Sequence, residues 1–136
     1  MIKIIYGEII NEILLSEHRQ YLCGDLKIPQ KLEEIFDENV EVGITDYAEN
    51  KTETAHYHET CSEYQYVISG ETEIMDLDTD CTVKLKKGDF FVIRPKTRYF
   101  QKAKKGCRIL FFKYPSGNDK VKTSLSAEQI KWGEKI

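Results

Sequence analysis

The chain has 136 residues, of which 40% are hydrophobic and 11% are aromatic, and its formal net charge at pH 7 is −3. This length and apolar content predict one globular domain with a hydrophobic core and argue against a disordered chain. The slightly acidic balance gives no support for a nucleic-acid or anionic-membrane partner, and no stretch is as long as a membrane span.

Two candidate elements lie near the N-terminus. Residues 2–6 are β-branched and aromatic and predict a first strand, whereas the periodicity of residues 9–15 does not decide between strand and helix. Apolar residues spaced i, i+3, i+4 predict a short amphipathic helix over residues 31–36. We expect residues 1–39 to form an N-terminal extension, a strand plus a short helix, that packs on the main domain.

From residue 40 the pattern changes to short β-rich runs separated by turn residues. The predicted strands are residues 40–47, 52–58, 63–69, 72–77, 81–85, 90–93, 99–103 and 108–114. Short strands at such regular spacing predict an all-β domain over residues 40–114, either a β-sandwich or a jelly-roll barrel.

The remaining residues, 115–136, predict a loop followed by a C-terminal helix. Ser126 fits an N-cap, and Gln129 three residues later completes a capping box. The four cysteines form no C-x-x-C pair and the N-terminus has no secretory signal, so we expect a cytoplasmic protein with free thiols.

The most informative stretch contains His56 and His58, followed five residues later by Glu63. Side chains alternate along a strand, so both imidazoles face the same side, and a return strand brings the carboxylate beside them. Such a set suits a divalent metal ion, and Fe, Mn, Ni and Zn remain open. A hydrogen-bonded polar cluster without metal is the alternative. The third histidine, His18, lies outside this pattern and is expected at the surface.

The stretch resembles the first motif of the cupin family, which continues from H-x-H through a glutamate to a glycine. His56, His58, Glu63 and Gly70 fit its spacing. The resemblance covers residues 40–114 and implies a cupin double-stranded β-helix, or jelly-roll barrel, with an N-terminal extension and a short C-terminal helix. It also implies a homodimer and a small-molecule ligand.

The second cupin motif is matched only in part. Gly88, Asp89, Ile93 and Pro95 fit, but Tyr99 stands where the family usually has a histidine as fourth metal ligand. The pKa of a free phenol is about 10, so a tyrosine ligates well at neutral pH only where the metal lowers that value. Three roles remain open for this residue: a phenolate ligand, as in cupins such as ectoine synthase; a catalytic acid, base or hydrogen-bond donor; or part of a pocket that has lost its metal.

Strand alternation adds two candidate substrate contacts. Gln65 falls on the same face as Glu63, and Gln101 on the same face as Tyr99, although both glutamines could instead lie on a solvent face. The resemblance implies a metal-dependent enzyme acting on a small polar metabolite, of the sugar or keto-acid type, by isomerase, lyase or dioxygenase chemistry. The alternatives are a non-catalytic ligand-binding cupin and a metal-free isomerase that uses His56 or His58 as base and Tyr99 as acid.

Overall fold

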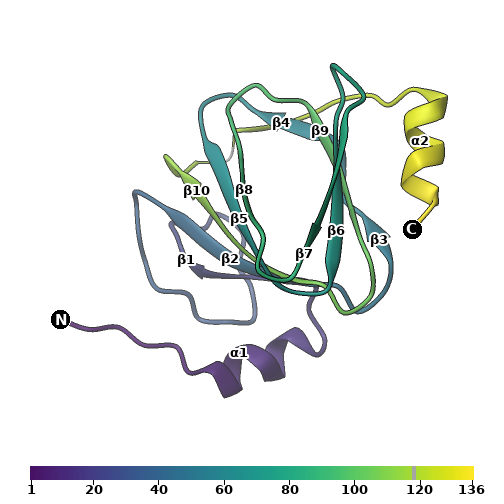
Figure 1. The fold of residues 1–136 in the computed structure, drawn as a ribbon. Helices are drawn as coiled ribbons and strands as arrows, with labels where there is room; N and C mark the ends of the chain where they lie inside the picture. Colours follow the sequence, from purple (N-terminus) through teal and green to yellow (C-terminus); the bar gives the residue numbers. More distant parts are fainter. Residues whose placement is uncertain (118) are drawn as a thin grey trace.

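A computed structural model describes residues 1–117 and 119–136 and shows two antiparallel sheets that face each other and form a barrel (Figure 1). The first sheet has the strand order β1 (Arg19–Cys23), β2 (Glu41–Asp46), β10 (Arg108–Tyr114), β5 (Ser62–Ser69), β8 (Phe90–Ile93). The second has the order β11 (Lys120–Lys122), β4 (His56–His58), β9 (Tyr99–Ala103), β6 (Glu71–Asp76), β7 (Thr82–Lys86), and β3 (Lys51–Thr52) also pairs with β9. The predicted all-β jelly-roll fold is confirmed.

The predicted strand over residues 52–58 is interrupted, and the interruption shapes the site. Thr52 pairs with Lys102 and His56 pairs with Tyr99, so one strand advances four residues while its partner advances three. One extra residue therefore lies between β3 and β4, as in a β-bulge, and it reverses the alternation of side chains. Consequently Glu53 and His56, which are an odd number of residues apart, both face the interior of the barrel.

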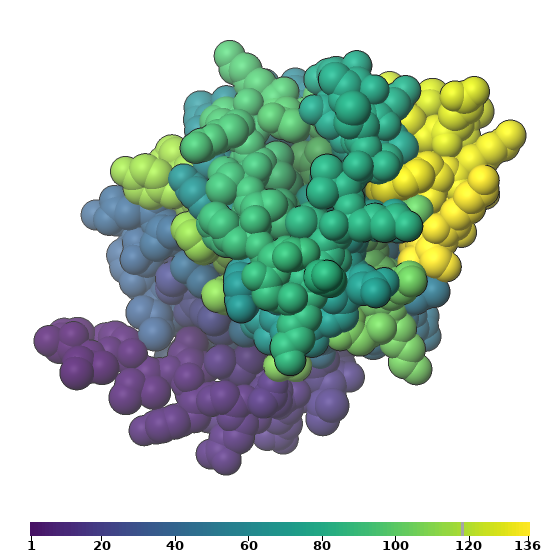
Figure 2. All heavy atoms as spheres, viewed as in Figure 1, coloured from purple at the N-terminus to yellow at the C-terminus, as the bar shows by residue number. Residues whose placement is uncertain are grey.

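The prediction of a strand over residues 2–6 is wrong, and so is the prediction of a helix over residues 31–36. The free edge of β1 is occupied by residues 30–35: the Gln30 side chain bonds both backbone groups of Tyr21, and the Ile35 amide donates to the Leu22 carbonyl at 2.9 Å. These tertiary contacts override the helical propensity of a short segment. Residues 1–6 consequently have no strand partner among the described residues and project from the body (Figure 2).

The two helices lie outside the barrel. The ambiguous run near the N-terminus is a helix, α1 (Gly7–Leu14), and α2 (Ala127–Glu134) has the predicted capping box between Ser126 and Gln129. The α2 helix packs Trp132 against Phe100 of β9, with ring centroids 5.6 Å apart. Neither helix is long and apolar enough to cross a membrane.

One hydrophobic cluster lies between the sheets, and another packs against Trp132 of α2. The fully buried members of the first cluster include Val67 of β5 and Cys107, which precedes β10. Gly70 turns from β5 into β6 with φ +75, and a Cβ at this position would lie 2.5 Å from the Cys107 Cα. Only glycine combines a positive φ with the absence of a Cβ atom that would clash with Cys107. This explains why the first motif ends in a glycine at position 70.

Candidate functional site

The barrel encloses a cavity of about 110 Å³ between the two sheets. All six residues that the sequence nominates lie on its wall: His56, His58, Glu63, Gln65, Tyr99 and Gln101. All six are buried, and they come from three strands, β4, β5 and β9. Bulge and register therefore gather residues that are up to 45 positions apart along the chain, from His56 to Gln101.

His56 has a defined protonation state because both ring nitrogens are engaged. Nδ1 lies 2.6 Å from the Thr54 carbonyl oxygen, which can only accept, so this nitrogen carries the proton. Nε2 lies 2.8 Å from the Tyr99 hydroxyl and therefore accepts from it. Burial, reinforced by nearby Lys120 and His58, lowers the pKa of His56 to about 4. Burial likewise raises the pKa of Tyr99 well above its usual value, so the pair is a neutral imidazole facing a neutral phenol.

His58 presents an unpartnered nitrogen to the cavity. Its Nδ1 lies 3.0 Å from Asp119 Oδ1 and donates to it, so Nε2 is an acceptor in the neutral ring and a donor toward Glu63 in the protonated ring. Nε2 is buried, has no hydrogen-bond partner in the described chain, and lies 3.6 Å from Glu63 Oε1. Burial alone would raise the pKa of Glu63, but the His58 ring, the Lys113 ammonium and the Gln65 amide lower it, so Glu63 is a carboxylate.

This His58–Glu63 pair fits a metal ion. With the ring neutral, two acceptors 3.6 Å apart repel each other, and either a proton on Nε2 or a metal ion between them relieves the repulsion. Ligands bound at 2.0–2.2 Å to a tetrahedral ion lie about 3.3–3.6 Å apart, which matches the observed separation. The open lone pair of His58 and the carboxylate of Glu63 are therefore arranged as two ligands.

The predicted triad is not gathered as a set, however. In the described part of the chain, the one group of three ligating atoms within 4.8 Å of one another is His58, Cys61 and Asp119. The Asp119 carboxylate already accepts from the Thr60 amide and hydroxyl and from the Cys61 amide, and burial raises the pKa of Cys61 to about 12, so this thiol stays protonated. This group is better described as an anchor that orients His58. His56 can bind a metal ion only if its Nε2 gives up the hydrogen bond from the Tyr99 hydroxyl and coordinates the ion instead.

The two glutamines hold the carboxylate in place. Gln65 donates to Glu63 Oε2, and Gln65 and Gln101 exchange hydrogen bonds of 3.2 and 3.0 Å. Gln101 also donates to the Thr72 hydroxyl at 3.0 Å. Since their amide groups are engaged with each other and with protein groups, the glutamines position Glu63 in this structure.

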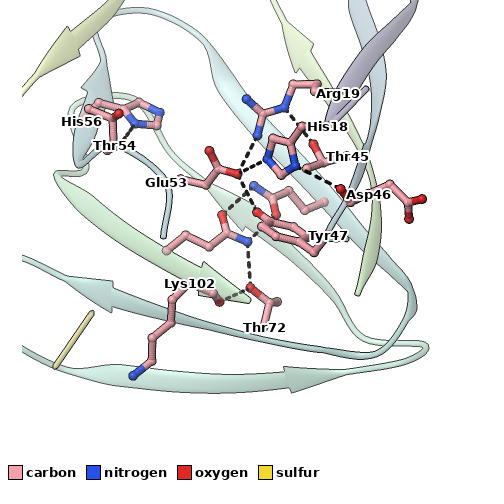
Figure 3. A network of polar contacts seen from close by, with 12 residues as sticks. His18, Arg19, Thr45, Asp46, Tyr47, Glu53, Thr54, His56, Thr72 and Lys102 are labelled. Atoms are coloured by element: carbon pink, nitrogen blue, oxygen red, sulfur yellow. Dashed lines mark hydrogen bonds and ion pairs between the residues drawn. The ribbon is translucent and has the colours of Figure 1, made fainter. Parts of the chain in front are cut away.

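A second polar cluster, which is partly buried and which we call the Glu53 cluster, comprises Glu53, His18, Arg19 and Tyr47 (Figure 3). Glu53 Oε1 lies 2.7 Å from His18 Nε2, 3.1 Å from Arg19 Nη2 and 2.9 Å from the Tyr47 hydroxyl. The expectation that His18 lies at the surface is wrong: its ring is half-buried and both nitrogens are bonded. No sequence motif indicated this cluster, because it depends on the bulge before β4 and on the unpredicted strand β1.

Comparison with known proteins identifies the family of the domain. A family model described as "Cupin domain" matches residues 43–110, half of the chain. No curated protein matches the chain significantly.

Several solved structures share the fold. An uncharacterized protein with a double-stranded β-helix domain from Klebsiella pneumoniae has a TM-score of 0.57 and 17% identity, covering 65% of this chain and 78% of its own. The polyketide cyclase RemF from Streptomyces resistomycificus has a TM-score of 0.56 and 15% identity, with 72% and 70% covered. The nucleoside dehydratase Pac13 from Streptomyces has a TM-score of 0.56 and 18% identity, with 68% and 74% covered.

Proposed function

The chain belongs to the cupin superfamily, and on that premise we propose that it is a metal-binding enzyme acting on a small polar metabolite. The observation that carries the proposal is the buried Nε2 of His58, which has no hydrogen-bond partner in the described chain and faces the Glu63 carboxylate at 3.6 Å. Buried polar atoms are almost always satisfied, so an exception inside a cavity indicates a missing ligand.

His58 and Glu63 would hold the divalent ion, and His56 and Tyr99 would complete its surroundings. Imidazole and carboxylate ligands suit Fe, Mn, Ni and Zn, and the donor set does not choose among them. A bound ion would supply Lewis acidity toward a substrate oxygen.

The His56–Tyr99 pair supports proton transfer as the reaction type. A neutral imidazole can accept a proton at Nε2, and a buried neutral phenol can donate one, so the pair contains a base and an acid 2.8 Å apart. Proton removal at one substrate atom and delivery at another give isomerisation, or elimination where a group leaves. Two fold neighbours are a polyketide cyclase and a nucleoside dehydratase, which shows that this barrel can house enzymes.

A metal-free isomerase is the second candidate, because the His56–Tyr99 pair stands complete without an ion. In that case His56 is the base and Tyr99 the acid, and the unpartnered nitrogen of His58 would bond the substrate. Metal content separates the two candidates.

The experiment is metal analysis of protein purified without a metal-affinity column. Near-stoichiometric metal that is lost in His58→Ala and Glu63→Gln supports the metal enzyme; Glu59→Gln, an exposed neighbour in the same stretch, is the control and keeps its metal. Protein without bound metal, whose melting temperature does not respond to added Fe, Mn, Ni or Zn, overturns it.

Proton transfer is tested by deuterium exchange. Wild-type protein is incubated in D2O with a panel of small sugars and keto acids, and the loss of C–H signals is followed by proton NMR. We expect Tyr99→Phe to keep the metal and lose the exchange. Loss of the metal in this variant would instead make Tyr99 a ligand, and no exchange with any compound contradicts isomerase chemistry for this panel.

We also propose a homodimer formed by the outer face of the first sheet. Tyr66 and Phe90, which pair across β5 and β8, are 44% and 55% exposed, and Tyr64 stacks on Phe112 beside them. Exposed aromatic patches of this kind mark interaction sites. Gel filtration that shows only a 16 kDa species at micromolar concentration contradicts the dimer.

None of the four cysteines is paired, which supports a reducing compartment such as the cytoplasm.

A further inference from the structure

Three cationic side chains line the cavity together with its histidines. Arg19 of β1, Lys113 of β10 and Lys120 of β11 all line it, against two lining carboxylates, Glu53 and Glu63. With three cations and two anions, the lining groups carry a net charge of +1, and a divalent ion would raise it further. The whole chain is acidic, so this local excess is opposite in sign to the protein's net charge of −3.

Arg19 is held rigidly with one end free. Its Nε donates to the Thr45 hydroxyl at 2.8 Å, its Nη2 lies 3.1 Å from Glu53, and its guanidinium lies 5.6 Å from the Phe111 ring centroid. The remaining amino group, Nη1, donates no hydrogen bond within the described residues (Figure 3). A guanidinium fixed in this way is preorganised for an anionic group, because no side-chain freedom remains to be lost on binding.

The two lysines differ in how far they are neutralised. Lys113 lies 3.4 Å from Glu41 and 3.3 Å from the Tyr21 hydroxyl. Lys120, at the exposed mouth, makes no hydrogen bond or ion pair of its side chain with any described residue. Burial of its ammonium group, together with the charges of Arg19 and Lys113, lowers the pKa of Lys120, which shows how closely the cations crowd. An anion in the cavity would relieve this repulsion.

We propose that the substrate is a small carboxylate, whose carboxyl group binds to Arg19 and Lys120 while the rest of the molecule faces His56 and Tyr99. This inference rests on the proposed function, for which it names the substrate class. A cavity of about 110 Å³ is smaller than the roughly 150 Å³ that hold benzene, so the enclosed part is a short-chain acid. In metal-free protein, a net lining charge of +1 matches a monoanion better than a phosphate, which carries nearly two charges.

The test uses metal-free protein and three probes: acetate, its neutral isostere acetamide, and inorganic phosphate. Binding is followed by chemical-shift changes of the backbone and of the arginine Nε–H groups in isotope-labelled protein. We expect acetate to bind at least tenfold more tightly than acetamide, and phosphate to bind more weakly than acetate. Equal affinities for acetate and acetamide, or phosphate as the tightest of the three, overturn the proposal.

Variants localise the binding. Arg19→Gln should weaken acetate binding at least tenfold, whereas Arg108→Gln should leave it unchanged, since Arg108 makes a comparable pair with Asp46 at 3.1 Å outside the cavity. Lys120→Gln changes an exposed side chain, so the variant protein should fold normally. This substitution should weaken acetate binding about threefold. Wild-type affinity in both Arg19→Gln and Lys120→Gln overturns the assignment.

Acetate binding and metal binding can be lost independently of each other. His58→Ala removes a proposed metal ligand but neither cation, so it should abolish metal binding and retain acetate binding. If the wild-type protein binds no metal yet discriminates acetate from acetamide through Arg19, the metal enzyme is wrong and the carboxylate site stands. If the wild-type protein binds metal but does not discriminate acetate from acetamide, the carboxylate site is wrong and the metal enzyme stands.

Discussion

The cavity has two polar walls that accommodate buried charge in opposite ways. On the wall formed by the Glu53 cluster, one carboxylate oxygen has three partners within 3.1 Å, and two of these, His18 and Arg19, make a further bond of their own. On the histidine wall, His58 Nε2 has no hydrogen-bond partner in the described chain and faces another acceptor. A carboxylate whose partners surround it stabilises the fold, whereas a buried acceptor without a partner costs stability that a ligand can restore.

The difference also explains why the two walls lie side by side. The Glu53 cluster ties β1 and β2 to the segment between β3 and β4, and that segment sets the direction of His56. The satisfied wall therefore fixes the geometry that the unsatisfied wall requires. Loss of the Glu53 carboxylate should therefore appear as lost stability, and damage to the histidine wall mainly as lost metal binding.

The largest effect is expected for Glu53→Ala. The substitution leaves His18, Arg19 and Tyr47 without their shared acceptor in a largely buried site, and we expect a loss of about 3 kcal/mol in the free energy of unfolding, measured by urea denaturation. The control is Glu71→Ala, whose pair with Lys104 is about 60% exposed on both sides and should contribute less than about 1 kcal/mol. Equal losses in the two variants would remove the distinction between the walls.

The walls should also differ in the pH range over which they lose stability. Burial mainly lowers the pKa of His56, from about 6.5 to about 4, so the unfolded chain takes up its proton first as the pH falls. The contribution of His56 is complete above pH 6.5 and declines toward pH 4. Burial would raise the pKa of Glu53, but the His18 hydrogen bond and the Arg19 charge lower it from 4.5 to about 2, so its contribution is complete above pH 4.5 and is lost toward pH 2.

In metal-free protein we expect each pH window to account for about 3 kcal/mol of the free energy of unfolding. Thermal denaturation at a series of pH values measures both. His56→Gln should remove the pH dependence of stability between pH 6.5 and 4 and retain that between pH 4.5 and 2. Glu53→Gln should remove the pH dependence between pH 4.5 and 2 and retain that between pH 6.5 and 4. A variant that flattens both windows would show that the walls titrate as one unit.

The smallest stability effect is expected for Asp119→Ala. It removes four hydrogen bonds around the residue 58–61 turn, but the site is partly exposed, so we expect a loss of about 1 kcal/mol. Because Asp119 orients His58, metal affinity should fall 10–100-fold, roughly, as measured by competition with a chelator. Asp37→Ala is a matched control, since Asp37 anchors a similar turn through the Asn39 and Val40 amides far from the cavity. Unchanged metal affinity in Asp119→Ala would limit Asp119 to the turn.

The sequence predicts the barrel well because its strands alternate with period two and are separated by turn residues. It also nominates His56, His58, Glu63 and Tyr99, since their spacing follows a motif that the family resemblance makes readable. These features are local, and each can be read within a few residues. The same reasoning fails for residues 31–36, whose helical spacing is outweighed by contacts with the edge of β1.

What the sequence does not predict arises from contacts between distant segments. Arg19 and Glu53 meet only because β1 joins the sheet and one extra residue precedes β4. Asp119 lies beyond the last predicted strand, and nothing in its neighbourhood marks it as the partner of His58. Such residues become visible only when the register of the strands is known.

The bond between His58 and Asp119 has a consequence for biosynthesis. The two residues are 61 positions apart, so His58 leaves the ribosome long before the group that orients it. A nascent chain that ends at Tyr114 contains every strand of the predicted barrel and still lacks the oriented imidazole. The imidazole is therefore oriented only after all the predicted barrel strands have been synthesised, and metal capture during synthesis would have to wait until β11 is in place.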